Sequence, residues 1–561
     1  MDPCNNAPVQ AGLIQLPELK EKNSLRELLL NRAKKHAKKV FLIDPEKNRE
    51  YTYAEFLAAV NRISNLLFKL GIGKGDQVAV LMSNGPEYLL SLFAVMQLGA
   101  VACPINTHLK TAEISYILAN SDSVALFSDN GHLEISAMAL AGDNKVRYLL
   151  SWDDPPVNMK KNINRQTEPV KMLSLQRELQ QQAAKLLPEI AASALAGDDV
   201  AIIIYTSGTT GKPKGAMLTH QNMIVDAHWI THWNRLKAGD RAMCVMPLFH
   251  VNGQIVTVIT PLYHGGSIVI PEKFSVSNFF LLIIKYGVTY VGTVATMLSM
   301  LLNRVKPGDV VIPANRLRIV FCGSAPVPRE VQIAFEKTFQ VPVIEGYGMT
   351  ETTCRSTFNP LPPLKALKLG ANDGFRKIGS VGLPMGNEIR IVDPDDNQLG
   401  PNKVGEIVIR GANVMKGYYK DPLATEAAFK EGWFYSGDLG YFDGEGYLYV
   451  VDRKKDMIIR GGENIYPWEI EEVLLQHPAL KDAGCIGIPD LLYGEEVVAF
   501  VVLKKNETIR EEELISFCQH YLADFKCPKK IKILAKIPKG PSGKLLRNKL
   551  REQFGFSENS L

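Results

Sequence analysis

The stretch Tyr205–Gly215 holds residue types that bind a dense anion. Its sequence, YTSGTTGKPKG, places hydroxyl side chains, three glycines and two lysines within eleven positions. Glycine lets backbone N–H groups turn toward an anion with no Cβ in the way. Hydroxyls donate hydrogen bonds, and lysines supply positive point charges. The composition therefore predicts a loop that binds a polyphosphate.

Two other interpretations of this loop exist. A flexible Ser/Thr/Gly surface loop has a similar composition. A Walker A loop needs Gly-x-x-x-x-Gly-Lys-Ser/Thr, but here Gly208 and Gly211 are too close and Pro213 follows Lys212. The spacing disfavours a P-loop kinase or ATPase, whereas the surface loop stays open from these residues alone.

A second stretch, Glu345–Glu351, offers complementary groups for a nucleotide. Tyr347 has a flat aromatic face that can stack on a base. Thr350 carries a hydroxyl for a phosphate, and Glu351 supplies the hard oxygen ligand that Mg²⁺ prefers. Farther along, Asp438 can accept two hydrogen bonds from a ribose diol. A turn with a surface glutamate is the competing interpretation.

Seven segments, in order along the chain, resemble the motifs of the adenylate-forming superfamily, which includes acyl-CoA synthetases, luciferases and peptide-synthetase adenylation domains. The resemblance covers about residues 25 to 555. The segments are Tyr205–Gly215, Met246–Gly253, Cys322–Pro326, Glu345–Glu351, Tyr435–Gly440, Asp452–Glu471 and Pro538–Arg547. In the last segment Gly540 replaces the usual Thr and Pro541 follows it, but the functional lysine position, Lys544, is retained.

The resemblance implies roles for the matched residues. Lys544, His250 and Glu351 would be catalytic, and Thr206 with Glu351 would hold Mg²⁺. Lys455 would be the hinge pivot. ATP or AMP would bind Thr206, Ser207, Gly208, Thr209, Thr210, Gly211, Lys212, Lys214, Gly323, Ser324, Ala325, Pro326, Glu345, Gly346, Tyr347, Gly348, Thr350, Asp438 and Arg453. The CoA tunnel would contain Gly461, Gly462 and Glu463, and the acyl pocket His250 as a gate, Asn252, Gly253 as a wall without a side chain, Val294 and Met297.

The resemblance implies an ATP-dependent acyl-CoA synthetase that forms an acyl-adenylate, releases pyrophosphate and passes the acyl group to CoA. The pocket segments carry no Lys or Arg, so we expect a medium- or long-chain fatty acid. A ligase that delivers to a carrier protein, and a CoA ligase for an aromatic or other small carboxylate, are alternatives. From another class, the alternative is a nucleotide-binding sensor on the same fold.

Strand-like and helix-like segments alternate, which predicts an α/β fold with mostly parallel, layered sheets. Residues 1–451 would form a large adenylation domain with a small β-barrel or sheet at about 376–451. Residues 452–561 would form a small, mobile α+β domain with its hinge at 452–456. The polar stretch 153–182 is expected to be a linker or loop. Expected elements include helices over Leu25–Lys35, Tyr53–Leu70 and Pro86–Leu98, and strands over Asp76–Met82, Asp199–Ile204 and Asp240–Met246.

Composition narrows the function classes. A net charge of +5 on 561 residues gives no warrant for nucleic-acid binding. No run of about 18 apolar residues predicts a membrane span, and no C-x-x-C pair predicts a zinc or disulfide site among the eight cysteines. The start of the chain does not resemble a signal peptide, so a reducing, cytoplasmic location is expected. A homodimer, peripheral membrane contact and a targeting role for the terminal Asn-Ser-Leu are left open.

Overall fold

The computed structural model describes residues 16–19, 24–155, 162–163, 169–206, 213–305, 317–363, 366–540 and 544–553. Two predicted features, Ser207–Lys212 of the phosphate loop and the terminal Asn559–Leu561, lie outside the described residues.

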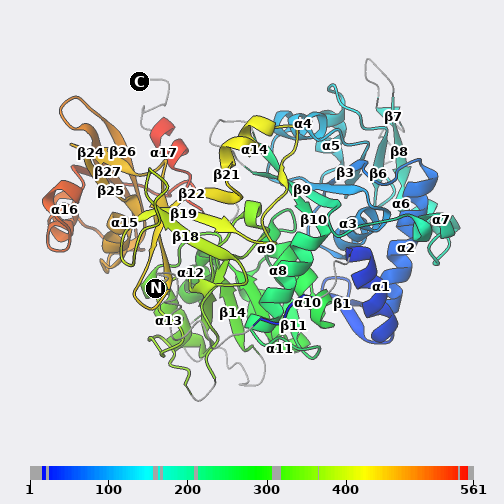
Figure 1. Ribbon diagram of the computed structural model, residues 1–561, viewed down its shortest axis with the longest axis horizontal. Helices are drawn as coiled ribbons and strands as arrows, with labels where there is room; N and C mark the ends of the chain where they lie inside the picture. The colour runs from blue at the N-terminus through cyan, green and yellow to red at the C-terminus, as the bar shows by residue number, and fades with distance from the viewer. Residues whose placement is uncertain are drawn as a thin grey trace.

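Two mostly parallel sheets form the frame of the large N-terminal part (Figure 1). The nine-stranded sheet has the order β20-β10-β9-β4-β3-β5-β6-β8-β7, and the seven-stranded sheet has the order β15-β14-β13-β11-β12-β1-β2. The first contains β3 (Gln77–Leu81), β4 (Val101–Pro104), β5 (Ala125–Ser128), β6 (Tyr148–Ser151), β7 (Asn162–Ile163), β8 (Val170–Ser174), β9 (Val200–Thr206), β10 (Lys214–Thr219) and β20 (Gly417–Tyr418). The second contains β1 (Val40–Asp44), β2 (Arg49–Thr52), β11 (Arg241–Met243), β12 (Ser267–Val269), β13 (Tyr290–Thr293), β14 (Ile319–Cys322) and β15 (Val343–Glu345).

Helices lie between the two sheets and on their outer faces. The largest apolar core joins residues of both sheets to α1 (Leu25–Lys35), α2 (Tyr53–Lys69), α3 (Pro86–Leu98), α8 (His220–Trp233) and α10 (Thr260–His264). A second core places α11 (Val276–Tyr286), α12 (Ala295–Arg304) and α13 (Arg329–Phe339) outside the seven-stranded sheet. A third places α4 (Thr111–Asn120) and α5 (Leu133–Leu140) outside the nine-stranded sheet. Because both sheets are covered on both faces, central strands such as β4 and β14 are apolar and buried along their whole length.

Local signals in the sequence set several of these helices. Ser24 and Glu27 form a capping box at the start of α1, and Thr52 and Glu55 form one at the start of α2. Pro86 opens α3, and Gly99 ends it in the left-handed region with φ of 77°. These caps satisfy backbone groups that a helix end leaves unpaired. The predicted bounds of α1 and α3 are confirmed.

Two sequence-based assignments were wrong. The stretch 153–182 is not only a linker, because it supplies β8 and the short helix α6 (Leu175–Glu178) at one side of the nine-stranded sheet. The strand expected over Asp240–Met246 is only β11, three residues long. The polar residues around it hid β8, a short strand with a buried Val170 and an exposed Lys171.

A smaller antiparallel sheet follows, made of β18 (Glu388–Val392), β19 (Gly405–Arg410), β21 (Phe429–Lys430), β22 (Trp433–Phe442) and β23 (Leu448–Arg453). Beside it are the pair β16 (Thr357–Phe358) and β17 (Leu383–Pro384), and α14 (Pro422–Ala428). The strand pairs among the described residues leave this sheet open, so the sheet rather than the barrel is the form observed.

The C-terminal part is a compact α+β unit (Figure 1). Its sheet contains β24 (Ile458–Arg460), β25 (Glu463–Ile465), β26 (Leu480–Asp490), β27 (Gly494–Leu503) and β28 (Lys530–Ile533). The helices α15 (Pro467–Leu475) and α16 (Glu511–Gln519) pack on one face, and α17 (Arg547–Gln553) packs on the other. The predicted α/β class with a large N-terminal part and a small C-terminal part is confirmed.

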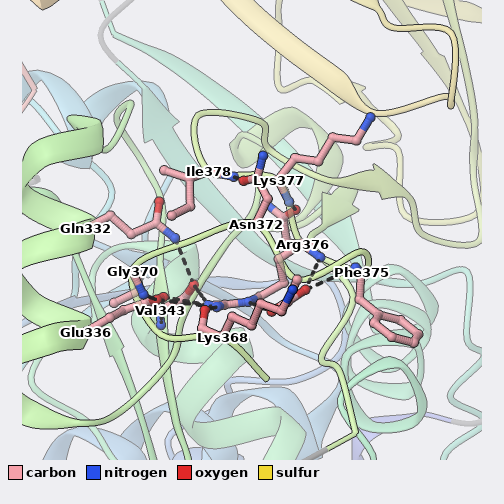
Figure 2. A network of polar contacts seen from close by, with 12 residues as sticks. Gln332, Glu336, Val343, Lys368, Gly370, Asn372, Phe375, Arg376, Lys377 and Ile378 are labelled. Atoms are coloured by element: carbon pink, nitrogen blue, oxygen red, sulfur yellow. Dashed lines mark hydrogen bonds and ion pairs between the residues drawn. The ribbon is translucent and has the colours of Figure 1, made fainter. Parts of the chain in front are cut away.

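A buried ion-pair network fastens the segment 366–378 to α13 (Figure 2). The Arg376 side chain, 1% exposed, lies 2.5 Å from Glu336 Oε1 and 2.8 Å from Asp373 Oδ2. Arg376 also donates to the backbone oxygens of Val343 and Lys368. These acceptors offset the desolvation of the guanidinium, so the network holds this irregular segment against the seven-stranded sheet.

Candidate active site

Four adjacent parallel strands of the seven-stranded sheet end at one edge, where predicted site segments begin. Val294 follows β13, Gly323 follows β14 and Gly346 follows β15, and β11 lies on the other side of β13. Cys322 at the end of β14 pairs with Glu345 at the end of β15. Ligands of open α/β sheets bind at the carboxyl ends of the strands. The topology therefore brings the predicted nucleotide and acyl segments together.

The nucleotide residues Tyr347, Asp438 and Arg453 are in direct contact. The Tyr347 hydroxyl donates to Asp438 Oδ2 at 2.9 Å, and Arg453 Nε lies 3.1 Å from Asp438 Oδ1. Asp438 and Arg453 face each other across β22 and β23, so the sheet register fixes their pair. Burial and the Asp438 charge raise the pKa of Tyr347 well above its usual range. Tyr347 therefore stays a neutral donor that orients the carboxylate expected to hold ribose.

A second set of contacts joins Glu351, the predicted metal ligand, to Lys214 of the predicted phosphate loop. Glu351 lies on a short 3-10 turn, Thr350–Thr352, and its Oε1 accepts a hydrogen bond from the Tyr418 hydroxyl at 2.9 Å. Lys214 Nζ lies 5.4 Å from the centre of the Tyr418 ring, which is a cation–π distance. Burial and the Glu351 charge raise the pKa of Tyr418, so this phenol remains protonated. Tyr418, which the sequence analysis missed, thus positions two predicted site residues.

The phosphate loop connects β9 to β10. Thr206, the last residue of β9, pairs with Lys214, the first of β10, so the two strands bring both ends of the loop together. Thr206 and Lys214 are half-buried. The residues between, Ser207–Lys212, lie outside the described part of the chain.

The residues near Glu351 suit Mg²⁺. Among the described residues no cluster of three His, Cys, Asp or Glu side chains can hold a metal ion. Mg²⁺ bound to a nucleotide needs only one or two carboxylates, because phosphates and water complete its shell. Glu351, half-buried, has one oxygen bonded to Tyr418, and the Thr206 hydroxyl is the other predicted ligand. These residues fit a magnesium ion that ATP brings with it.

Lys544 is an unpaired cation beside the nucleotide residues. Burial, followed by repulsion from Arg453, lowers its pKa to about 8, although Asp438 and Asp456 act in the opposite direction. No ion pair within 4.0 Å joins Lys544 to a carboxylate in the described part of the chain. Its ammonium group is therefore available to a phosphate, and its catalytic role stays a prediction.

The loop after β14 is held under strain. Ser324 is a non-glycine residue in the left-handed region, with φ of 70°. Its hydroxyl accepts a hydrogen bond from Asn252 Nδ2 at 3.3 Å. Ala325 is half-buried and Pro326 is exposed. Strain of this kind persists where surrounding structure fixes it, and it gathers at ligand sites.

Glu345 is a buried carboxyl at the end of β15. Its Oε1 accepts from the Val327 backbone at 3.1 Å, but its Oε2 has no partner. Burial raises its pKa to about 8. Glu345 is thus largely protonated at neutral pH and contributes little negative charge to the site.

The predicted acyl-pocket segments contain buried polar atoms that have no hydrogen-bond partner. His250 begins α9 (Val251–Gln254), which continues through a π-helical turn, Ile255–Ile259, into α10. Burial and the nearby His108 lower the pKa of His250 to about 4, so the ring is neutral. His250 Nε2 and Asn252 Oδ1 are buried without partners.

Gly253, predicted as a pocket wall, packs closely against backbone. A Cβ at Gly253 would lie 2.7 Å from the Pro247 carbonyl oxygen and 3.1 Å from that of Met246. Its missing side chain therefore allows this close backbone packing, and the pocket-wall role stays a prediction. Val294 is buried and Met297 is half-buried against the core outside the sheet.

Arg355, the other residue that the sequence analysis missed, is 1% exposed. It follows the Thr350–Thr352 turn, and a Cβ at Gly323 would lie 2.2 Å from its Nη1. Its position in the sequence could have identified it. Arg355 is a charged residue within the otherwise uncharged run Thr352–Phe358, directly after the Glu345–Glu351 motif.

The predicted hinge residue Lys455 and the predicted CoA residues Gly461–Glu463 lie at the start of the small C-terminal part. Backbone pairing of β23 continues through Arg453, and Lys454 N donates to Gly437 O at 2.9 Å. Lys455 follows as an exposed turn residue. Gly461 and Gly462, with φ of 60° and 88°, form the turn before Glu463 between β24 and β25. That hairpin lies far from β9 and β10 in Figure 1, so the structure does not bring the predicted CoA residues to the strands that flank the predicted phosphate loop.

Comparisons with known proteins agree with this geometry. Family models described as AMP-binding enzyme and AMP-binding enzyme C-terminal domain match residues 29–419 and 469–544. Sulfoacetate–CoA ligase of Cupriavidus necator is 36% identical over 94% of this chain and 97% of its own. Long-chain-fatty-acid–CoA ligase FadD13 of Mycobacterium tuberculosis is 35% identical over 91% and 95%. The crystal structure of ATP-bound MatB from Rhodopseudomonas palustris aligns with a TM-score of 0.82 at 29% identity, covering 94% of this chain and 99% of that one.

No helix in the described ranges is long and apolar enough to cross a membrane. The joined nucleotide residues, the family models over most of the length and the full-length CoA-ligase relatives lead to one conclusion. The chain belongs to the AMP-binding, adenylate-forming enzyme family and is an ATP-dependent CoA ligase.

Proposed function

We propose that this enzyme works through an acyl-adenylate, with Lys544 and the Asp438–Arg453 pair acting in the first half-reaction. A substrate carboxylate oxygen forms a bond to the α-phosphorus of ATP as the bond to the pyrophosphate oxygen breaks. Pyrophosphate leaves with that electron pair. The CoA sulfur then attacks the acyl carbon, AMP leaves, and the thiol proton passes to solvent.

The observation that carries this proposal is the position of Lys544 beside Asp438 and Arg453, with its pKa lowered to about 8. Asp438 would hold the ribose and Tyr347 would lie on the adenine. A charged Lys544 would then face the α-phosphate, where negative charge grows in the transition state. Glu351 and Thr206 would hold Mg²⁺, which neutralises phosphate charge when bound. The remaining work is positioning.

The small domain would act in both half-reactions. Lys544 lies beside the nucleotide residues, whereas Gly461–Glu463, the predicted CoA segment, lies elsewhere on the same domain (Figure 1). A rotation near Lys455 would exchange the two segments, which is a hinge motion of a known kind. The domain boundary at 452 and the pivot at Lys455 are parts of this proposal.

The acid is decided by the pocket and not by the fold, because relatives of similar identity are named for sulfoacetate and for long-chain fatty acids. The sequence predicts a medium- or long-chain fatty acid. The polar atoms of Asn252, Ser324 and Arg355 favour a smaller, more polar acid instead.

The first test of the function is carboxylate-dependent pyrophosphate release measured with and without CoA. CoA-dependent AMP release is expected, whereas a ligase for a carrier protein would retain the adenylate and a nucleotide sensor would release nothing. The matched variant is Lys544→Ala. It should lose adenylation but keep most thioester formation from supplied acyl-adenylate and CoA, and equal loss of both steps in a folded variant would contradict the assigned role.

A further inference from the structure

Arg355 is a buried arginine whose hydrogen-bonding capacity is mostly unused. Its Nη1 donates to the Gly346 carbonyl oxygen at 3.3 Å, whereas Nε and Nη2 have no acceptor. No carboxylate lies within 4.0 Å of its guanidinium in the described ranges, where Arg376 has two such partners. A buried guanidinium without acceptors is costly, so a ligand anion is the expected partner.

Arg355 differs in this respect from another buried arginine. Arg26, 6% exposed, donates to the Gln97 carbonyl, the Ser193 carbonyl and the Ser193 hydroxyl, so its nitrogens are satisfied without a carboxylate. Arg355 has one acceptor for five N–H groups. Arg26 and Arg376 thus donate from every guanidinium nitrogen, whereas Arg355 donates from Nη1 alone.

The Arg355 guanidinium is fixed in place by two nonpolar surfaces. Its Cζ lies 5.3 Å from the centre of the Phe358 ring. A Cβ at Gly323 would meet Nη1 at 2.2 Å, so the glycine leaves the room that the guanidinium fills. Gly323 and Gly346 begin the two site loops after β14 and β15. The cation therefore lies at the carboxyl edge of the sheet, at the level where the substrate must bind.

Nearby carboxyl groups do not neutralise Arg355. Asp226 Oδ2 accepts from the Arg355 backbone N–H at 3.0 Å, and its Oδ1 has no partner. Burial raises the pKa of Asp226 well above its usual range, and that of Glu345 to about 8. Burial therefore disfavours the charged form of both carboxyl groups, and neither forms an ion pair within 4.0 Å of the Arg355 guanidinium in the described part of the chain.

Further unsatisfied polar atoms lie on the segments that adjoin this edge. Asn252 donates to Ser324, the residue after Gly323, while its own Oδ1 has no partner. A Cβ at Gly292, in the neighbouring strand β13, would lie 3.5 Å from Asn252 Oδ1. Arg355 thus lies against Gly323, and the Asn252–Ser324 hydrogen bond lies at the next residue; this group of polar side chains suits a substrate with a second polar end.

We propose that Arg355 binds a second anionic group of a short acid substrate, so that the enzyme activates a dicarboxylate or sulfonated carboxylate. The inference rests on the proposed CoA-ligase function. The first carboxylate would react near Lys544 and Glu351, while the second group would accept hydrogen bonds from Nε and Nη2. A bidentate guanidinium–anion pair combines charge with fixed geometry. A short acid is expected because the Arg355 guanidinium lies against Gly323 and Gly346, which begin the loops that carry the predicted nucleotide residues.

The experiment compares matched acids with wild-type enzyme. Pyrophosphate release is measured with malonate against butyrate and with sulfoacetate against propionate, and laurate and ferulate represent the fatty and aromatic alternatives. The dianionic acids should give the higher kcat/KM. A preference for butyrate, laurate or ferulate would overturn the inference while leaving the CoA-ligase function intact. Failure of every acid to release pyrophosphate, despite ATP binding, would instead count against the proposed function.

Arg355→Met, Arg355→Lys and the control Arg318→Met complete the design. Arg318 pairs with Asp240 away from the site. Arg355→Met should lower kcat/KM for the preferred dianion by about 30-fold or more, and by much less for its matched monoacid. Arg355→Lys should recover part of the loss, whereas the control should affect both acids equally. Equal losses for both acids in Arg355→Met would overturn the inference. Should Arg355→Met fail to fold, the wild-type comparison still decides.

Discussion

Raising the pH should inhibit adenylation by removing the charge of Lys544. Its pKa is lowered from 10.5 to about 8, mainly because the amine is buried and secondly because Arg453 repels its charged form. Below pH 8 the ammonium is intact and can stabilise the developing charge on the α-phosphate. As the pH rises through about 8, the free enzyme loses this cation and its ability to use ATP should fall.

The size of the effect follows from the pKa shift. A shift of about 2.5 units at 1.36 kcal/mol per unit gives about 3 kcal/mol against the charged amine in this conformation. The penalty is complete below pH 8, declines as the pH rises from about 8 toward 10.5, and vanishes above 10.5. As the pH rises, the closed form without nucleotide therefore becomes more stable, while the enzyme becomes less able to catalyse adenylation. Bound ATP would favour the charged amine and raise its pKa again.

The assay is ATP–pyrophosphate exchange across the range from about pH 6.5 to 9.5. The value of kcat/KM for ATP reports groups of the free enzyme, so it should fall about tenfold per pH unit above about pH 8. Lys544→Arg keeps its charge because the guanidinium pKa exceeds 12, so its profile should stay flat there. Lys544→Met should be slow at every pH. An identical alkaline decline in wild type and Lys544→Arg would refute the assignment of the decline to Lys544.

Three further predictions concern single contacts. Tyr418→Phe removes one hydrogen bond to Glu351 and should raise the Mg²⁺–ATP requirement by about 2- to 10-fold, while Glu351→Gln should lower activity by about 100-fold or more. Magnesium titrations of activity measure both effects. A Tyr418→Phe enzyme identical to wild type would contradict the positioning role of Tyr418. Glu336→Gln leaves Arg376 with a broken buried ion pair and should destabilise the fold by about 3–5 kcal/mol, seen as a lower thermal midpoint without a changed order of acid preference. Gly253→Ala should also lower the thermal midpoint because its new Cβ meets backbone. A shifted acid preference in a stable variant would support the pocket-wall role.

Much of the fold could be predicted because local signals and burial pattern agreed. Pro86 and Gly99 delimit α3, and a capping box begins α1. Asp438 and Tyr347 could be named as ligand residues since their side chains suit ribose and adenine. The register of β22 and β23, which pairs Asp438 with Arg453, is a tertiary result that no local spacing reveals.

The remaining site features depend on contacts between distant segments. Tyr418 lies 67 residues from Glu351, so their hydrogen bond has no local signature. Gly253 was assigned to the pocket by the family resemblance of its segment, whereas the approach of the Pro247 carbonyl oxygen, which also requires a glycine, depends on the folded backbone. The predicted acyl segments contain no Lys or Arg. The edge as a whole is nevertheless charged, because Arg355 reaches it from another loop.

Charge balance connects Lys544 and Arg355, two cations of the site. Lys544 and Arg355 come from different domains, and neither has a carboxylate within 4.0 Å in the described part of the chain. ATP can compensate Lys544, since its phosphates lie beside the ribose that Asp438 would hold. A fatty acid has one carboxylate, and that group is consumed by adenylation, so it leaves Arg355 buried and uncompensated. A dianionic acid retains its second charge after the first has reacted and compensates Arg355 in the acyl-adenylate as well. The intermediate would then be held at both ends while the small domain rotates, which favours transfer to CoA over escape of the adenylate.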